Sequence, residues 1–278
     1  MVVWLFSLLV FAVSYLAGIV GALTGLGGGV IIIPVLVLLF KVDIHYAMGA
    51  SLISIIATSS GSSIAYFRQG YTNLKIGIFL ESGAVVGALI GAYLVAFVPT
   101  SIIAIVLGVV LIFSAAFSIK KKEHTHEEER SHPWAISLQM DGEYPTNEGL
   151  KSYHVQRVPQ ALSLLTVAGI MSGLLGIGAG ALKVLAMDKA MGLPYKVSTA
   201  TSNFIIGITA TVSCGIYLAR GYIEPTIAFP VLLGVAIGGY SGAKIFAKLQ
   251  SKILRLIFTI VILIVAVELI YKGSVGGL

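Results

Sequence analysis

Two glycine-rich segments hold the residues of this chain that are best suited to do chemistry. The first, LTGLGGGVIIIP, covers residues 23–34 and has four glycines in five positions. The second, GLLGIGAGALKV, covers residues 173–184 and has a lysine three positions after its last glycine. A helix that begins after such a break carries unpaired N–H groups with a partial positive charge. Both segments are therefore suited to bind an anion through the backbone.

The sequence around both segments is typical of an integral membrane protein. Of the 278 residues, 57% are hydrophobic and 11% are charged, and the mean hydropathy is +0.98. Backbone N–H and C=O groups without hydrogen bonds are costly in hydrocarbon, so a glycine break at membrane depth is expected to have a function. Long apolar runs without strict alternation predict an all-α helical bundle and not a β-barrel. The runs cover residues 4–40 (interrupted), 47–66, 76–98, 102–119, 159–185 (interrupted), 200–218, 227–246 and 253–270.

Charge and cysteine content exclude several classes of protein. Cys214 is the single cysteine, which excludes an intramolecular disulfide framework and a cysteine-clustered metal site. The formal charge of +6 does not indicate nucleic acid here, because the basic residues flank apolar runs and orient the chain in the membrane. The apolar N-terminus lacks a basic leading region, so we expect it to be retained and not cleaved as a secretory signal.

The chain contains an internal repeat. A shift of 151 positions places residues 17–29 on residues 168–180, and the matches are rich in glycine, serine, threonine and tyrosine. Chance similarity between two apolar segments would match leucine, isoleucine and valine instead. The repeat predicts an N-terminal repeat at 1–119, a polar linker at 120–158 and a C-terminal repeat at 159–278.

Basic residues predict how the two halves face. If residues 4–40 and 159–190 are re-entrant hairpins, each descending for about 16 residues or about 24 Å, each half keeps three full crossings and the halves are inverted. Fourteen basic residues then lie on one face and three on the other, as the positive-inside rule requires. The larger set is Arg68, Lys75, Lys120, Lys121, Lys122, Arg130, Lys151, Arg157, Lys189, Lys196, Lys244, Lys248, Lys252 and Arg255, and the smaller is Lys41, Arg220 and Lys272. This predicts a cytoplasmic linker and both termini outside.

The linker itself is expected to be a solvated, flexible connector. Its histidines, which suggest a metal site only weakly because they lack compact ligand spacing, are His124, His126, His132 and His154.

Inverted repeats with broken helices near the bilayer midplane are typical of secondary transporters. The glycines expected to let the backbone approach a ligand are Gly27, Gly28, Gly29, Gly178 and Gly180. Lys183 could neutralise a bound anion; alternatively it extends to an interface or pairs with Glu81 or Asp188.

Small polar residues follow each glycine segment in GASLIS and TATSNF, which we expect to be helix starts. The candidate donors there are Ser51, Thr201, Ser202 and Asn203. Close helix packing is the alternative role for the small ones. Glu81 is expected near a helix end at the interface, with proton coupling as its less favoured role. Stripes of small residues that we expect to pack helices are Gly83, Gly87, Gly91 and their copies Gly234, Gly238, Gly242.

At these residues the sequence resembles the TauE/SafE family, also called the toluene-sulfonate uptake permease family. The resemblance rests on GALTGLGGGVIIIPVL and SGLLGIGAGALKVLAM, each followed by small polar residues in MGASLISI and STATSNFI, and on the polar linker. It implies transport of sulfite, sulfonates, thiosulfate or similar anions without ATP. It also implies ligand-binding roles for the paired glycines, Ser51 and Ser202. The halves differ, since Lys183 and Leu185 stand where the first half has Ile32 and Pro34.

The leading hypothesis is thus a secondary transporter for small sulfur-containing or organic anions, located in the cytoplasmic membrane and working by alternating access. An anion channel and a metal-ion carrier are the alternatives. No enzyme is expected, because the sequence offers no acidic pair or nucleophile and base at mid-span. The expected partners are a small anion and the lipid bilayer, with a homo-oligomer left open, no nucleic acid and no cofactor.

Overall fold

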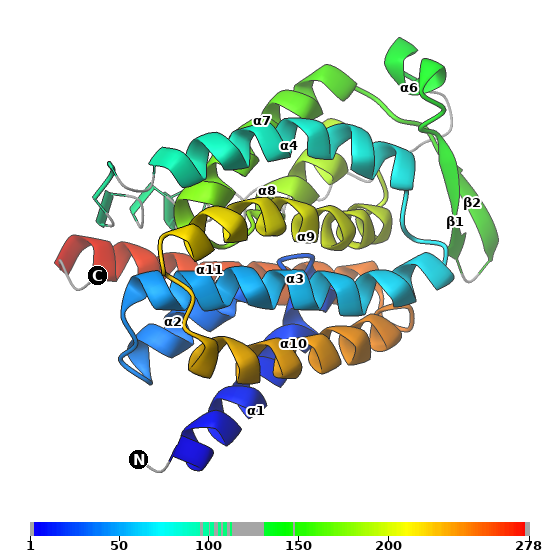
Figure 1. Ribbon diagram of the computed structural model, residues 1–278. Helices are drawn as coiled ribbons and strands as arrows, with labels where there is room; N and C mark the ends of the chain where they lie inside the picture. Colours follow the sequence, from blue (N-terminus) through cyan, green and yellow to red (C-terminus); the bar gives the residue numbers. More distant parts are fainter. Residues whose placement is uncertain are drawn as a thin grey trace.

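The structure, a computed structural model, describes residues 3–94, 97–99, 101–102, 105–106, 108–109, 112, 131–146 and 148–275. The first half contains α1 (Val3–Thr24), α2 (Gly29–Leu38), α3 (Ile44–Arg68) and α4 (Leu74–Leu94). The second contains α7 (Val158–Leu175), α8 (Gly180–Leu185), the π-helix η1 (Ala186–Ala190), α9 (Tyr195–Ala219), α10 (Pro225–Phe246) and α11 (Ser251–Val275). Between them lie α6 (Pro133–Ser137), β1 (Gly142–Thr146) and β2 (Gly149–Tyr153) (Figure 1).

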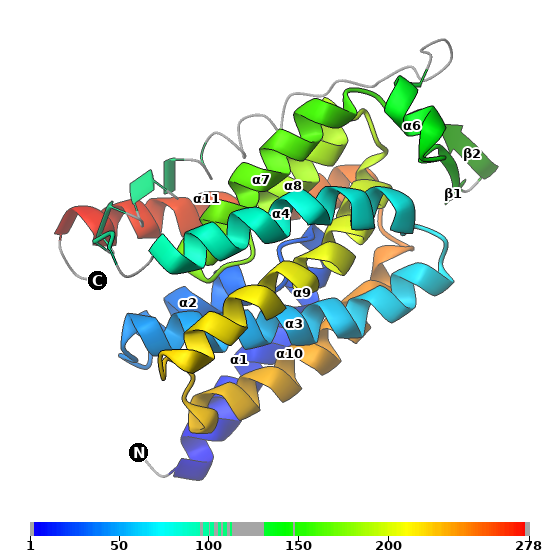
Figure 2. The same ribbon diagram turned by 45° about the horizontal axis from the view of Figure 1, so that its top comes forward.

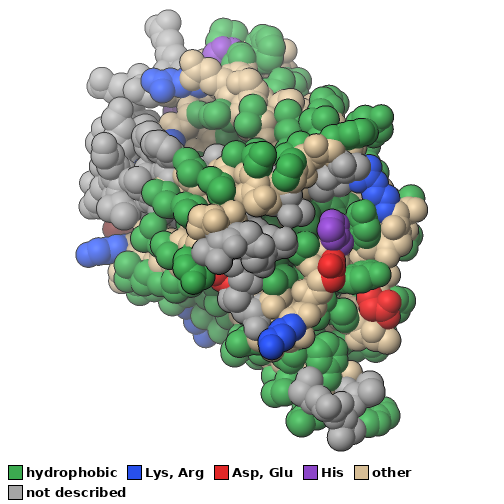
Figure 3. Space-filling model, turned by 90° about the vertical axis from the view of Figure 1, so that its left-hand side faces the viewer, with side chains coloured by type: hydrophobic (Ala, Val, Ile, Leu, Met, Phe, Trp, Pro, Cys, Tyr) green, Lys and Arg blue, Asp and Glu red, His purple; other side chains and the backbone are tan. Residues whose placement is uncertain are grey.

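Six helices among the described residues are long and apolar enough to cross a membrane. They are α1, α3, α4, α7, α9 and α10. Large apolar side chains on these helices point outward, such as Ile78 and Phe229, which are 62% and 65% exposed. Hydrophobic side chains also cover much of the described surface in Figure 3, with few charged ones between them. An apolar exterior of this kind suits lipid contact, and the predicted all-α membrane protein is confirmed.

The bounds of the helices follow the internal repeat. A shift of 151 positions carries the bounds of α3 exactly onto those of α9, and it carries α4 onto α10 to within one residue. In Figure 1, α3 and α9 run in opposite directions, as do α4 and α10. The last apolar run of the first half, residues 102–119, lies mostly outside the described residues.

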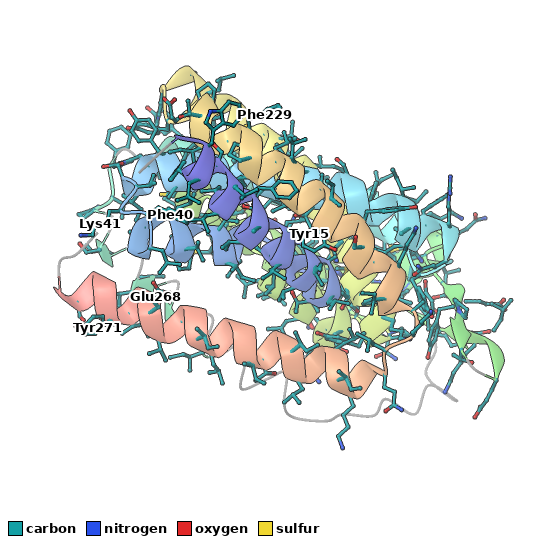
Figure 4. All side chains as sticks on the ribbon, turned by 90° about the horizontal axis from the view of Figure 1, so that it is seen from below. Tyr15, Phe40, Lys41, Phe229, Glu268 and Tyr271 are labelled. Carbon is teal, nitrogen blue, oxygen red and sulfur yellow. The ribbon has the colours of Figure 1, made fainter. Side chains whose placement is uncertain are left out.

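Each glycine-broken segment is a hairpin that begins and ends at the same end of the bundle. The rings of Phe6 and Phe40 lie 5.2 Å apart, so the start of α1 meets the end of α2. Phe40 and Lys41 are seen there in Figure 4. In the second half the Gln156 N–H donates to the Met191 carbonyl at 3.1 Å, and Met191 is the repeat counterpart of Phe40. The expected descent of about 16 residues is wrong, since α1 has 22 residues and α7 has 18.

The two halves exchange their packing partners. Helix α1 packs along α10, and α7, the counterpart of α1, packs along α4, the counterpart of α10 (Figure 2). Glycines allow both close approaches: a β-carbon at Gly87 would lie 2.1 Å from the Thr166 carbonyl oxygen, and one at Gly238 would lie 2.1 Å from that of Tyr15. The predicted role of the glycine stripes in helix packing is confirmed.

The linker is more ordered than expected. Residues 131–146 and 148–153 include α6 and the antiparallel pair β1–β2, so a flexible connector is wrong for this part. The cause is a small apolar cluster that the charged composition conceals: Ala135, Met140, Tyr153 and Val155 are buried against α4, α7 and η1. Asn73 ties this unit to the start of α4, because its amide donates to the Met140 carbonyl and the Tyr153 hydroxyl, both at 2.8 Å.

The chain ends and the linker unit lie at opposite ends of the bundle. Helix α1 starts and α11 ends at the left of Figure 1, whereas β1 and β2 lie at the right. The described basic residues whose helix ends or loops belong to the β1–β2 end are Arg68, Lys75, Lys151, Arg157, Lys189, Lys196, Lys244, Lys248 and Lys252. Lys41 and Arg220 belong to the other end. This agrees with the predicted charge asymmetry, and the orientation in the cell stays a prediction.

Candidate functional site

The two breaks, here called tip 1 (residues 25–28) and tip 2 (residues 176–179), have positive φ angles at the same three repeat positions, although ψ differs at the last of them, −34° at Gly28 and 31° at Ala179. The positive φ angles are 79°, 76° and 67° at Gly25, Gly27 and Gly28, and 64°, 73° and 46° at the counterparts Gly176, Gly178 and Ala179. Glycine adopts this region without steric cost, whereas an alanine there costs about 1 kcal/mol. The surrounding structure therefore imposes the tip geometry even where the sequence has Ala179.

The two tips are in direct contact inside the protein. A β-carbon added at Gly180 would lie 2.2 Å from the Gly25 carbonyl oxygen and 2.9 Å from the Leu26 Cα. Two isoleucines related by the repeat flank the contact: a β-carbon at Gly27 would lie 3.2 Å from Ile55 and 3.3 Å from Ile206. Both isoleucines are fully buried. The tips are thus in contact with each other, and the side chains of Ile55 and Ile206 cover the contact.

Ser51 and Ser202 connect the halves reciprocally. The Ser51 hydroxyl donates to the Gly176 carbonyl at 2.8 Å, and the Ser202 hydroxyl lies 3.2 Å from the Gly25 carbonyl. Each serine therefore binds the tip of the other half. The expectation that they stand at helix starts is wrong, because α3 begins at Ile44 and α9 at Tyr195. Seven residues of helix, about 10 Å, carry each serine to the depth of the tips.

Asn203 and Thr201 take different positions. The Asn203 amide donates to the Ala22 carbonyl at 2.9 Å, just before tip 1, and its buried Oδ1 atom has no hydrogen-bond partner among the described residues. The Thr201 hydroxyl accepts the Asn73 N–H at 3.1 Å. Asn203 therefore adjoins the tips, and Thr201 joins α9 to the start of α4.

Lys183 is fully buried and forms an ion pair with Glu81. The Nζ atom lies 2.9 Å from Glu81 Oε2, and the Thr209 hydroxyl contacts both side chains by accepting from Lys183 and donating to the other carboxylate oxygen. Glu81 is 3% exposed, so its expected interfacial position is wrong. The sequence left three roles open for Lys183, and in the structure it pairs with Glu81. Its charge is already compensated in this arrangement.

Tip 2 offers free hydrogen-bond donors. Within the described part of the chain, the N–H groups of Gly178, Ala179 and Gly180 have no hydrogen-bond acceptor. Of their counterparts in the first half, by contrast, the Gly27 N–H donates to the Gly21 carbonyl at 3.4 Å and the Gly29 N–H donates to the Gly27 carbonyl at 2.6 Å. Unpaired N–H groups at a helix start favour an anion. The two half-sites are therefore unequal in backbone bonding as well as in Lys183.

The linker histidines do not form a metal site in the described residues. No group of three histidine, cysteine or acidic side chains with metal-binding geometry occurs there. His154 lies at the surface, 3.6 Å from Asp141, and His132 caps α6. His124 and His126 lie outside the described residues.

Comparisons with known proteins agree with the membrane architecture. A family model described as sulfite exporter TauE/SafE matches residues 10–269. The probable membrane transporter protein YunE of Bacillus subtilis is 30% identical over 265 residues, which cover 93% of this chain and 95% of that protein. The probable membrane transporter protein YdhB of the same organism is 28% identical, covering 88% and 92%. The probable membrane transporter protein MJ0441 of Methanocaldococcus jannaschii is 24% identical, and the match covers 90% of this chain and 90% of that protein. No solved structure gives a significant match.

Proposed function

Because the chain belongs to the TauE/SafE family of membrane transporters, we propose that it carries small sulfur-containing or organic anions across the cytoplasmic membrane as a secondary transporter. The sulfur-containing class rests on the description of the family, sulfite exporter. The preference for an anion rests on the tips themselves.

The contact between tip 1 and tip 2 carries the proposal. Two hairpin tips with positive φ angles at matching positions meet inside the bundle, and the second half presents the N–H groups of Gly178, Ala179 and Gly180, which have no acceptor in the described part of the chain. Oxygen atoms of a sulfonate or sulfite accept several such hydrogen bonds at once, and the absence of β-carbons at Gly178 and Gly180 lets them approach the backbone. Binding requires Ile55 and Ile206 to move aside, so the ligand enters in a more open conformation.

Alternating access is supported by two equivalent closures at opposite ends of the bundle. At the β1–β2 end the Lys196 ammonium lies 5.4 Å from the centre of the Tyr71 ring, which also packs on Phe246 at 5.8 Å. At the other end the repeat counterparts His45 and Tyr222 stack with ring centres 4.9 Å apart. A cation over an aromatic ring at one end and a pair of packed rings at the other are each worth about 1 kcal/mol, strong enough to bias an end towards closure and weak enough to open. Opening one pair while the other stays closed would expose the tips to one side at a time.

Counterflow in proteoliposomes tests the proposal. Vesicles loaded with unlabelled sulfite, thiosulfate, sulfoacetate, taurine, sulfate or acetate are diluted into the labelled anion, and a carrier gives saturable, transient accumulation. We expect accumulation with at least one sulfur anion, and the same anion should raise the thermal stability of the purified protein, because it binds only the folded state. Flux without counterflow would indicate the channel instead, and no flux with any of these anions would contradict the proposal.

A further inference from the structure

The buried pair of Glu81 and Lys183 joins the two halves beside the tips. Glu81 lies on α4 of the first half, and Lys183 lies on α8 of the second half, three residues after Gly180. Their charged atoms are 2.9 Å apart, and the Thr209 hydroxyl of α9 contacts both groups. The pair is closed off from solvent, since Lys183 is 0% and Glu81 is 3% exposed.

The architecture does not require this pair. The repeat counterparts of Glu81 and Lys183 are Leu232 and Ile32, both apolar, although they occupy the same places in the other half. Thr58, the counterpart of Thr209, donates to the Ser54 carbonyl of its own helix at 2.8 Å. Buried charges at membrane depth carry a large desolvation cost and mark functional sites, because an apolar pair would stabilise the fold as well or better.

Among the described residues, the contacts given for the helices packed against α4 bring no other charged group to Glu81. Helix α7 has no charged residue, and Lys196 of α9 donates to the Ala247 carbonyl at 3.1 Å at the end of the bundle. Asp188 and Lys189 on η1 lie 3.5 Å from each other. Lys183 is therefore the charged partner of Glu81, and the Thr209 hydroxyl is its neutral partner.

We propose that Glu81 is a proton-binding site that couples anion transport to proton transport. When a proton from the aqueous side binds the Glu81 carboxylate, the ion pair opens and Lys183 becomes available to compensate the charge of an anion at the tips. The empty site holds Glu81⁻ and Lys183⁺, and the loaded site holds neutral Glu81, Lys183⁺ and one monovalent anion. Both states have zero net charge, so each can reorient across the membrane without moving charge. This coupling rests on the proposed anion transport.

Proton-driven accumulation in proteoliposomes tests the coupling. Labelled toluenesulfonate and thiosulfate are the probes, because neither titrates near neutral pH. With one proton per monovalent anion, an imposed gradient of one pH unit should drive about tenfold accumulation of toluenesulfonate. In Glu81→Gln, which resembles the protonated state, we expect anion exchange to persist while accumulation falls to the level of protein-free vesicles. Glu224→Gln, a matched change in the loop before α10, should accumulate like the wild type.

The outcomes separate the two proposals. If the wild-type protein exchanges neither probe nor any anion of the counterflow panel, both proposals fail together; if it exchanges only panel anions, the strongest of them replaces the probes in the same test. If it exchanges a probe and Glu81→Gln still accumulates it in response to the pH gradient, only the coupling is overturned. A measurement on the wild type covers the case in which the variant does not fold: a toluenesulfonate gradient should change the pH inside vesicles that contain a trapped pH dye. Anion entry without a pH change would overturn the coupling.

Discussion

Replacing Gly180 with alanine is the smallest change that tests the contact between the tips. The new β-carbon would lie 2.2 Å from the Gly25 carbonyl oxygen and 2.8 Å from the Ile206 side chain, and real β-carbons essentially never approach other atoms closer than 3.0 Å. The tips must therefore separate to lengthen the first contact from 2.2 Å to at least 3.0 Å. Such a shift also strains the Ser202 hydrogen bond to Gly25.

The expected free-energy change follows from two opposing effects. Overpacking a tightly filled interior costs about 1–3 kcal/mol. Alanine recovers up to about 1 kcal/mol through its higher helix propensity. We therefore expect Gly180→Ala to lower the free energy of unfolding by up to about 3 kcal/mol and to reduce anion counterflow strongly, since the tips no longer close together.

Gly215→Ala is the matched control. Gly215 lies in α9, and a β-carbon there would have no neighbour within 4 Å, so this variant should keep or slightly raise stability and keep counterflow. Thermal unfolding of purified protein and proteoliposome counterflow give the two readings. Wild-type stability together with wild-type counterflow in Gly180→Ala would refute the backbone contact between the tips.

Three further predictions concern single contacts and sidedness. Ser51→Ala should lower the free energy of unfolding by about 1–3 kcal/mol, because it leaves the buried Gly176 carbonyl without its 2.8 Å partner, while the exposed Ser60→Ala should change it by less than about 0.5 kcal/mol; equal unfolding temperatures would contradict this. Asp43→Ala should cost about 1 kcal/mol near neutral pH by removing the cap of α3. The hydrogen bond from the His45 N–H lowers the pKa of the Asp43 carboxyl from 3.8, so this stabilisation is present above pH 3.8 and is lost as the pH falls through the lower folded value. Unfolding of both proteins across pH 3–7 should show the difference shrink towards the acidic end, and a constant difference would argue against the charged cap. In a Cys214→Ser background, an impermeant thiol reagent should label Ser274→Cys but not Ser131→Cys in intact cells, and the reverse pattern would invert the predicted orientation.

The sequence is sufficient to predict the all-α membrane architecture and most of its helical segments. The glycines and small polar residues match at one offset, and that offset also relates the observed bounds of α3 and α9. Local patterns decide these features because a membrane helix must satisfy its own backbone and face lipid. The predicted position of Ser51 and Ser202 at helix starts is wrong by about two turns, because residues 44–50 and 195–201 before them are already helical.

The partners of buried polar groups could not be predicted in the same way. Pairing of Glu81 with Lys183 depends on how α4 is rotated against α8, and the sequence left several partners open for the lysine. Thr209 was missed, although its position between both charged groups makes it part of the site. The one available signal was its match to Thr58 in the repeat. The order in residues 131–146 and 148–153 was missed because four apolar residues within a charged segment do not form a periodic pattern.

An anion-bound structure tests the central claim most directly, for example by electron cryomicroscopy of the protein with an antibody fragment and the anion that gives the strongest counterflow. The account predicts density for one anion between residues 25–29 and 176–180, within hydrogen-bond distance of the N–H groups of Gly178 and Gly180, with Ile55 and Ile206 displaced. Anion density elsewhere in the bundle, with the two tips still in contact, would contradict it.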